Sequence, residues 1–341
     1  MFQRVLVPLD GSERAEQAIP VAVRIARAAH GSVILLRVPT KVTDLYMLSV
    51  EALEDMQDIM EAKRDEIKRY LAHLASSMAL EEVGIVTEVV DGTPAETILA
   101  VARAQEADLI VMCSHGYTCF KRWILGSIAQ KVAWHSTMPV LILREGDSHK
   151  LNSLSPNVGH PIRALVALDG TPFTEAAVMP AVQLVAACSA PARGEIHLTH
   201  VVKLPSLEEE ITYERLGTAT RLRQAALYKS NNHLHTMKER ISHEMTDELA
   251  VDITWSVEES TDVADSLLKI AQGEGEGTYI PSDLIALTTH GRTGLERWVR
   301  GSVAERVLSS TTMPLLIVHP HKLALSSASS TDESEHAAPY D

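Results

Sequence analysis

The sequence is poor in cysteine and has no long apolar run. It contains three cysteines in 341 residues, Cys113, Cys119 and Cys188, with no CxxC pair and no spacing typical of metal ligands. Such a set fits a reducing compartment and no structural zinc site. No segment reaches about 20 uninterrupted apolar residues, so we expect no membrane span. The N-terminus enters a strand directly and lacks the three-part pattern of a signal peptide, which predicts a cytoplasmic protein.

Positive charge is also scarce. The chain has 31 Lys and Arg residues against 45 Asp and Glu residues, a formal net charge of −14. This excess argues against DNA, RNA or an anionic membrane as a general partner, because their phosphates would be repelled. It does not argue against a small anion held by backbone amides. The length and the hydrophobic content of 45% suit two ordinary globular domains.

What the sequence does have is an internal repeat. Asp108–Gly116 (DLIVMCSHG) returns as Asp283–Gly291 (DLIALTTHG), 175 positions later. In both copies nine residues separate this His-Gly from a Gly-Ser pair, and a Thr-Met-Pro precedes a last apolar run. A repeat of this kind predicts one fold used twice.

Short apolar runs alternate with amphipathic stretches in each copy. This alternation predicts, twice over, a doubly wound parallel five-stranded sheet flanked by helices, a Rossmann-like α/β fold. In the first copy the expected strands are 5–9, 33–38, 85–90, 109–113 and 140–143, and the expected helices are 12–29, 48–79, 94–104 and 127–135. In the second copy the expected strands are 163–168, 196–201, 253–257, 284–287 and 315–318, and the long helix is expected at 207–248.

Composition also marks the domain boundaries. We expect a first domain over 1–147 and a second over 161–320. The segment 148–160 is rich in Ser and Asn and is interpreted as a linker. Residues 321–341 are acidic, rich in Ser and Ala and nearly devoid of large apolar residues, so they predict a disordered tail.

Three features of each copy should meet at the carboxyl edge of the sheet, where open parallel sheets bind ligands. They are the Asp after the first strand, the His-Gly after the fourth strand and the Gly-Ser that opens the last helix. Gly116 and Gly126 lack a Cβ, so the backbone can approach a ligand and adopt positive φ. Ser127 opens a helix whose first amides lack partners, which is typical of an anion site. Ser127 and Ser302 also fit a capping box, and both interpretations stay open.

These residues resemble the universal stress protein family, and the chain is similar to a tandem member over about 1–145 and 161–320. Nucleotide-binding members carry Gly, two residues, Gly, nine residues and then Gly-Ser or Gly-Thr after the fourth strand. Here Cys113 and Thr288 replace the first Gly, and the other elements match in both copies. The resemblance implies a Rossmann-like fold of the adenine nucleotide alpha hydrolase type.

By this resemblance, ATP or a related adenine nucleotide, with or without Mg²⁺, lies across the first and fourth strands of a domain. The aspartates would face the ribose or adenine, the valine that ends the second strand would lie near the base, and the Gly-Ser loop would hold phosphates. The first copy is slightly favoured, because Pro8 and Gly92-Thr-Pro94 are intact there. The implied nucleotide-binding residues are Pro8, Asp10, Val38, Met112, His115, Gly116, Gly126 and Ser127 in the first copy, and Asp169, Val201, Leu287, His290, Gly291, Gly301 and Ser302 in the second.

The resemblance also implies that the fifth strands, Val140–Leu143 and Leu315–Val318, pair with each other in an internal pseudo-dimer. Two chains could also associate. The leading hypothesis is a cytoplasmic protein that binds adenine nucleotide and acts in stress response or signalling. The alternative is a nucleotide-free interaction module of the same fold. No dedicated enzyme is indicated, since no Walker lysine motif is present, and slow ATP hydrolysis is the least favoured hypothesis.

Overall fold

The computed structural model describes residues 1–39, 50–77, 83–114, 125–144, 154, 161–205, 219–245, 249–274, 279–289 and 302–320. The first half contains β1 (Arg4–Leu9), α1 (Glu13–Glu16), α2 (Ala18–Ala28), β2 (Ser32–Arg37), α3 (Val50–Ser77), β3 (Gly84–Val89), α4 (Pro94–Ala104), β4 (Leu109–Cys113), α5 (Ser127–His135) and β5 (Val140–Leu143). The second half contains β6 (Arg163–Leu168), α7 (Pro172–Glu175), α8 (Val178–Ser189), β7 (Gly194–Lys203), α10 (Ala219–Glu244), β8 (Val251–Ser260), α11 (Val263–Gln272), β9 (Leu284–Thr288), α12 (Ser302–Ser310) and β10 (Leu315–Val318).

The ten strands of these two halves form one sheet, in the order β3-β2-β1-β4-β5-β10-β9-β6-β7-β8. Strands within each half are parallel, and the halves join where β5 pairs antiparallel with β10, placing Ile142 opposite Leu315 and Val140 opposite Ile317. The expected α/β fold and the expected pairing of the fifth strands are both confirmed. Because each fifth strand has a neighbour on both sides, neither presents an open edge to another chain.

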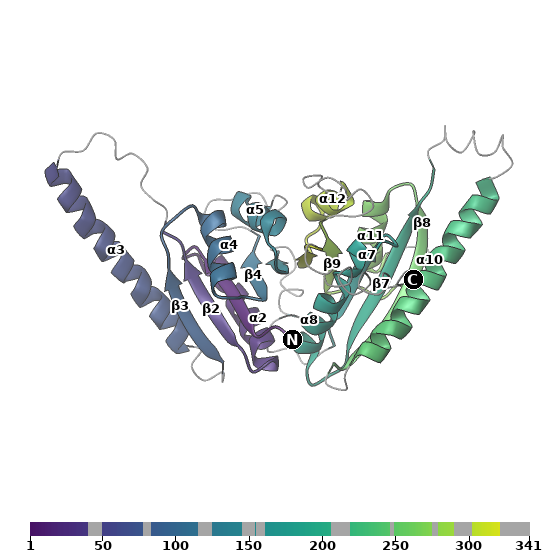
Figure 1. Ribbon diagram of the computed structural model, residues 1–341, viewed down its shortest axis with the longest axis horizontal. Coiled ribbons are helices and arrows are strands. Elements are labelled where there is room, and N and C mark those ends of the chain that lie inside the picture. The colour runs from purple at the N-terminus through teal and green to yellow at the C-terminus, as the bar shows by residue number, and fades with distance from the viewer. Residues whose placement is uncertain are drawn as a thin grey trace, which may run out of the picture.

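Period-two alternation along the strands builds a core on each face of this sheet. In β1, Val5 and Val7 point into the core that α2 and α8 share, and Leu6 points into the core under α4 and α5. All three side chains are fully buried, and each such burial contributes about 1.5–3 kcal/mol. The long helices α3 and α10 pack on β3 and β8, the two outermost strands (Figure 1).

Most strand predictions hold to within a residue or two, with informative exceptions. Strands β7 and β8 are ten residues long, so they extend beyond the predicted 196–201 and 253–257. The predicted helix 12–29 is two helices, α1 and α2. Helix α10 ends at Glu244, before the predicted 248, and the predicted portion 207–218 lies outside the described residues.

Two side chains, Ser12 and Asp10, organise the turn between β1 and α1. The hydroxyl of Ser12 accepts a hydrogen bond from the N–H of Ala15 at 3.2 Å, so Ser12 is the N-cap. Asp10 instead accepts from the N–H of Ser12 at 3.0 Å and from its hydroxyl at 2.5 Å. Asp10 therefore orients the cap while staying at the carboxyl end of β1.

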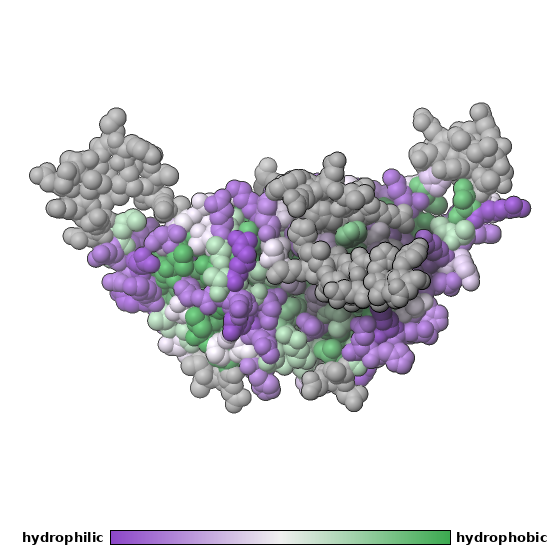
Figure 2. All heavy atoms as spheres, viewed as in Figure 1, coloured by the Kyte–Doolittle hydropathy of each residue, from purple (hydrophilic) through white to green (hydrophobic). Residues whose placement is uncertain are grey.

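The surface in view is mainly polar. On the face shown in Figure 2, hydrophilic residues cover much of both halves and apolar residues appear in separate patches. Scattered apolar patches of this kind are ordinary for a folded domain. None of the helices in the described part of the chain combines the length and apolar character needed to cross a membrane.

Candidate functional site

A cavity of about 620 Å³ lies at the carboxyl ends of β6, β7 and β9, and we call it the second-half cavity. Its walls come from the turn after β6, the end of β7, one face of α10, the start of α11 and the first turns of α12. Four residues implicated by the sequence, Asp169, Val201, Leu287 and Ser302, line it together. Residues more than 130 positions apart thus meet because parallel strands end at one edge of the sheet.

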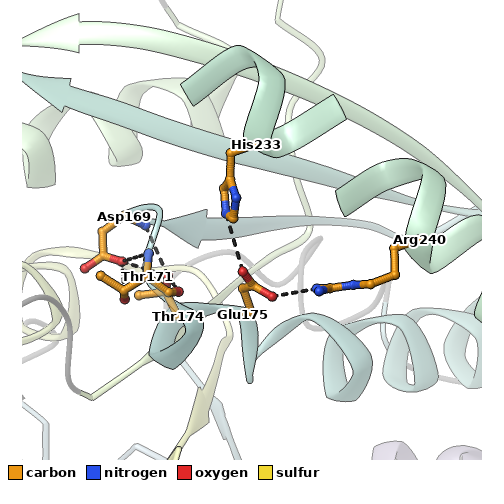
Figure 3. A network of polar contacts seen from close by, with 6 residues as sticks. All are labelled: Asp169, Thr171, Thr174, Glu175, His233 and Arg240. Atoms are coloured by element: carbon orange, nitrogen blue, oxygen red, sulfur yellow. Dashed lines mark hydrogen bonds and ion pairs between the residues drawn. The ribbon is translucent and has the colours of Figure 1, made fainter. Parts of the chain in front are cut away.

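Asp169 is held in place by the turn that it begins. Its Oδ1 accepts from the N–H of Thr171 at 2.9 Å, from the Thr171 hydroxyl at 2.6 Å and from the Thr174 hydroxyl at 2.8 Å (Figure 3). Gly170 between them has φ +78°, and a Cβ there would lie 3.3 Å from Cε1 of His200. The turn therefore needs glycine, both for its left-handed backbone and for room beside His200.

The first half carries a different side chain over the equivalent turn. Arg37 lies opposite Leu9 in the sheet register, as His200 lies opposite Leu168 in the second half. The Arg37 guanidinium donates to the carbonyl of Leu9 at 3.1 Å. Burial lowers the pKa of Arg37, and the nearby charge of Asp10 opposes that shift. The second half thus has a smaller imidazole where the first half has a guanidinium. The second-half cavity therefore lies in the copy that the sequence pattern did not favour for nucleotide binding.

The first-half residues implicated by the sequence also gather at the sheet edge. Val38, just after β2, and Met112, in β4, belong to one buried cluster with Ala129 of α5. Pro8 is half-buried near the end of β1. Five further residues implicated by the sequence lie outside the described part of the chain: His115, Gly116, His290, Gly291 and Gly301.

The start of α5 corrects two expectations. Gly126, not Ser127, is the N-cap, and no side-chain hydrogen bond caps this helix, so the capping-box interpretation of Ser127 is wrong. Gly126 has φ −60° and ψ 145°, so it does not use the left-handed region expected of it. Its N–H donates to the carbonyl of Ser114 at 2.8 Å. The N-cap of α5 thus supplies no side-chain oxygen to the amides of the first turn, and such amides are the groups that bind anions at helix N-termini.

The side chains that replace the family's first glycine leave the second-half cavity open. Thr288 is buried and forms part of its wall. In the first half, the Cys113 thiol donates to the carbonyl of Arg14 at 2.9 Å and packs in the core on the α2 face. Met112 points to the opposite face, because neighbouring residues of a strand alternate. Cys113 therefore lies on the other side of the sheet from the cluster of Val38 and Met112.

Four further lining residues escaped the sequence analysis: Lys203 at the end of β7, and Lys229, Ser230 and His233 on α10. His233 is half-buried and lies 3.5 Å from Oε1 of Glu175. The same carboxylate binds Arg240 at 2.5 Å (Figure 3), and this hydrogen bond raises the pKa of Arg240. Lys203 follows Val201 by two positions, so strand alternation was the one signal that could have found it.

The cavity can hold a ligand with an apolar and an anionic part. Val201, Leu267 and Leu287 offer an apolar wall, while Lys203 and Lys229 are exposed and bring positive charge to a chain of net charge −14. Within the described ranges, no three His, Cys, Asp or Glu side chains are grouped as they would be around a metal ion.

Comparison with known proteins identifies the family. The universal stress protein family model matches residues 1–144 and 163–319. A universal stress protein of Mycolicibacterium smegmatis is 24% identical over 331 residues, covering 93% of this chain and 97% of its own length. Universal stress protein YxiE of Bacillus subtilis is 30% identical over 151 residues, covering 42% of this chain and all of YxiE.

A solved structure shares the whole fold. The crystal structure of a universal stress protein from Archaeoglobus fulgidus covers 93% of this chain and 98% of that chain, with a TM-score of 0.61 and 20% sequence identity. YxiE matches about half of the chain, whereas the Mycolicibacterium and Archaeoglobus proteins match nearly all of it. The chain therefore belongs to the universal stress protein family and carries two of the family's domains in tandem.

Proposed function

We propose that the chain binds ATP or a related adenine nucleotide, with or without Mg²⁺, in the second-half cavity, and acts in stress response or signalling in the cytoplasm. The observation that carries the proposal is that Asp169, Val201, Leu287 and Ser302 line one cavity. Its volume of about 620 Å³ is within the usual range of small-molecule sites, about 300–1,000 Å³.

Each part of a nucleotide has a matching wall. The purine suits the apolar side chains of Val201, Leu267 and Leu287. The Asp169 carboxylate is an acceptor for a ribose hydroxyl or the adenine amine. Ser302 and Ala304 belong to the first turn of α12, whose backbone N–H groups lack intrahelical partners. Phosphate oxygens accept hydrogen bonds from such amides, and the helix dipole favours their negative charge.

A change at the start of α12 tests this placement. Ser302→Glu adds a negative charge at the first residue of the helix, where acidic side chains favour the helix itself. We expect isothermal titration calorimetry to show ATP binding at least about tenfold weaker, because the new charge repels the phosphates. Adenosine has no phosphate, so its binding should be unchanged.

The repeat supplies a matched control. Ser127 begins α5 as Ser302 begins α12, so Ser127→Glu adds the same charge at the equivalent site of the first half. If the second-half cavity is the nucleotide site, Ser127→Glu should bind ATP within about twofold of wild type. Equal ATP binding by wild type and Ser302→Glu would contradict the proposal, as would an absence of binding heat at millimolar ATP.

A further inference from the structure

Two basic side chains, one from each half, make equivalent hydrogen bonds to a helix of the other half. Arg144 follows β5 and His319 follows β10, 175 positions apart. The Arg144 Nη2 donates to the carbonyl of Leu308, in the last turn of α12. His319 Nε2 lies 3.0 Å from the carbonyl of Ala133, in the last turn of α5. Leu308 and Ala133 are also 175 positions apart, so the repeat has placed the same contact twice in opposite directions.

Each contact satisfies a carbonyl that its own helix leaves without a partner. The last four carbonyls of an α-helix lack intrahelical N–H donors. In α5 the carbonyl of Val132 takes the N–H of Ser136, and in α12 that of Val307 takes the N–H of Thr311, both at 3.0 Å. The next carbonyl in each helix is the one bound by the basic side chain of the other half. A basic group at a helix C-terminus also interacts favourably with the helix dipole.

The Arg144 guanidinium that makes this contact is deeply buried. Its side chain is 2% exposed, and burial lowers its pKa to about 10, so it stays charged at neutral pH. Its Nε and Nη1 have no hydrogen-bond partner among the residues that the structure describes. A movement of α12 away from Arg144 would take the Leu308 carbonyl from a buried charge, which is costly.

His319 also reaches the wall of the second-half cavity. A carbonyl can only accept, so Nε2 of His319 carries the proton that it shares with Ala133, and in the neutral ring Nδ1 is an acceptor. Nδ1 lies 2.9 Å from the hydroxyl of Thr289, which therefore donates to it. Thr289 is 1% exposed and lines the cavity. A hydrogen-bonded path thus runs from the cavity through Thr289 and His319 to α5.

Helix α12 provides a second path. Ser302, Ala304 and Val307 line the cavity, and the residue after Val307 offers its carbonyl to Arg144. Chains of packed side chains and hydrogen bonds such as these can carry coupling free energy between two sites. Both paths begin at cavity walls in one half and end on groups of the other.

We propose that the Thr289–His319 and α12–Arg144 contacts couple the two halves, so that a ligand in the second-half cavity changes the stability of α5 in the first half. The identity of the ligand rests on the proposed function, and ATP is the probe. A ligand that orders Thr289 and the first turn of α12 also holds the cross-half hydrogen bonds in place. Helix α5 begins after Gly126, which lies at the equivalent site of the first half. Ligand binding in the second-half cavity would therefore change the stability of that site.

Hydrogen exchange measured by mass spectrometry on the full chain, without ligand, tests whether the two halves are coupled. His319→Phe removes both hydrogen bonds of the ring, and Thr289→Val removes only the hydroxyl at nearly constant shape. Each should make the last-turn amides of α5 exchange about fivefold faster, the factor expected for one lost hydrogen bond. His73→Phe, an exposed position on α3, is the control and should leave α5 unchanged. Thr289→Val is the more telling variant, because its change lies in the second half and its readout in the first.

The ligand arm separates this proposal from the proposed function. With ATP present, wild type and His73→Phe should show slower exchange in α5. His319→Phe, whose ring does not line the cavity, should lose that slowing while its calorimetric heat persists. If wild type gives no calorimetric heat with ATP, the proposed function is contradicted. The exchange measurements without ligand would still test whether the two halves are coupled. Exchange in α5 that is the same in wild type, His319→Phe and Thr289→Val would overturn the coupling, as would ATP binding that leaves α5 exchange in wild type unaltered.

Discussion

The two contacts that Glu175 makes with the long helix α10 should hold this helix against the rest of the second half. Glu175 ends α7, and its two carboxylate oxygens reach His233 at 3.5 Å and Arg240 at 2.5 Å, both on α10. Helix α10 contributes Lys229 to the cavity wall. Glu175→Gln keeps the shape of the side chain and removes its charge, so it isolates the electrostatic part of this attachment.

The size of the effect follows from the exposure of the partners. Glu175 is 18% exposed and Arg240 52% exposed, so the pair lies between a surface ion pair, worth up to about 1 kcal/mol, and a buried charged hydrogen bond, worth about 1.5–3 kcal/mol. We expect Glu175→Gln to lower the free energy of unfolding by about 1–2 kcal/mol. The repeat again offers a control. Glu16 of the first half accepts from the Tyr70 hydroxyl at 2.7 Å. The amide oxygen of Gln can still accept this hydrogen bond and no cationic partner is lost, so Glu16→Gln should cost less than about 1 kcal/mol.

Urea unfolding followed by circular dichroism at low and high salt measures both variants. The loss in Glu175→Gln should shrink as salt screens the ion pair in wild type, while the loss in Glu16→Gln should not depend on salt. The reasoning is refuted if the two variants lose the same stability with the same salt dependence, or if Glu175→Gln unfolds like wild type. ATP binding by Glu175→Gln should also weaken, because α10 carries part of the cavity wall.

Two other changes probe the sheet. Ile142→Lys places a charge at a fully buried position opposite Leu315 in the β5–β10 junction; we expect a loss of at least about 3 kcal/mol, seen as a lower thermal midpoint, and an unchanged midpoint would contradict the junction. Burial, with a smaller contribution from Arg163, lowers the pKa of His197 to about 4. Since the unfolded imidazole titrates near 6.5, the unfolded state binds the proton first, and this group should remove roughly 2–3 kcal/mol of stability as pH falls from about 6.5 to 4. His197→Gln should flatten that part of the stability–pH curve, and an equally steep curve would contradict the assignment.

The sequence predicted the sheet well because strand signals are local. Buried parallel strands form short apolar runs, and β6 and β10 match their predicted ranges. Strand β7 extends to Lys203 because backbone pairing with β8 continues past the apolar residues. Hydrophobicity does not report such pairing.

The candidate site was predicted only in part. The motif located Asp169 and Ser302, but the pattern Ser-x-x-Gln could not distinguish a cap from a first helical residue, and Gly126 took the cap in α5. Helical periodicity shows which face of α10 is apolar, yet it does not show that Lys229 and His233 reach a cavity. The partnership of Glu175 with Arg240 joins residues far apart in the chain, which no local pattern contains.

A crystal structure of the full chain grown with ATP tests the central claim most directly. The account predicts nucleotide density in the second-half cavity, with the base against Val201 and Leu287 and phosphate oxygens within hydrogen-bond distance of the first-turn amides of α12. Nucleotide density located elsewhere, with the space between Asp169 and Ser302 empty at saturating ATP, would contradict it.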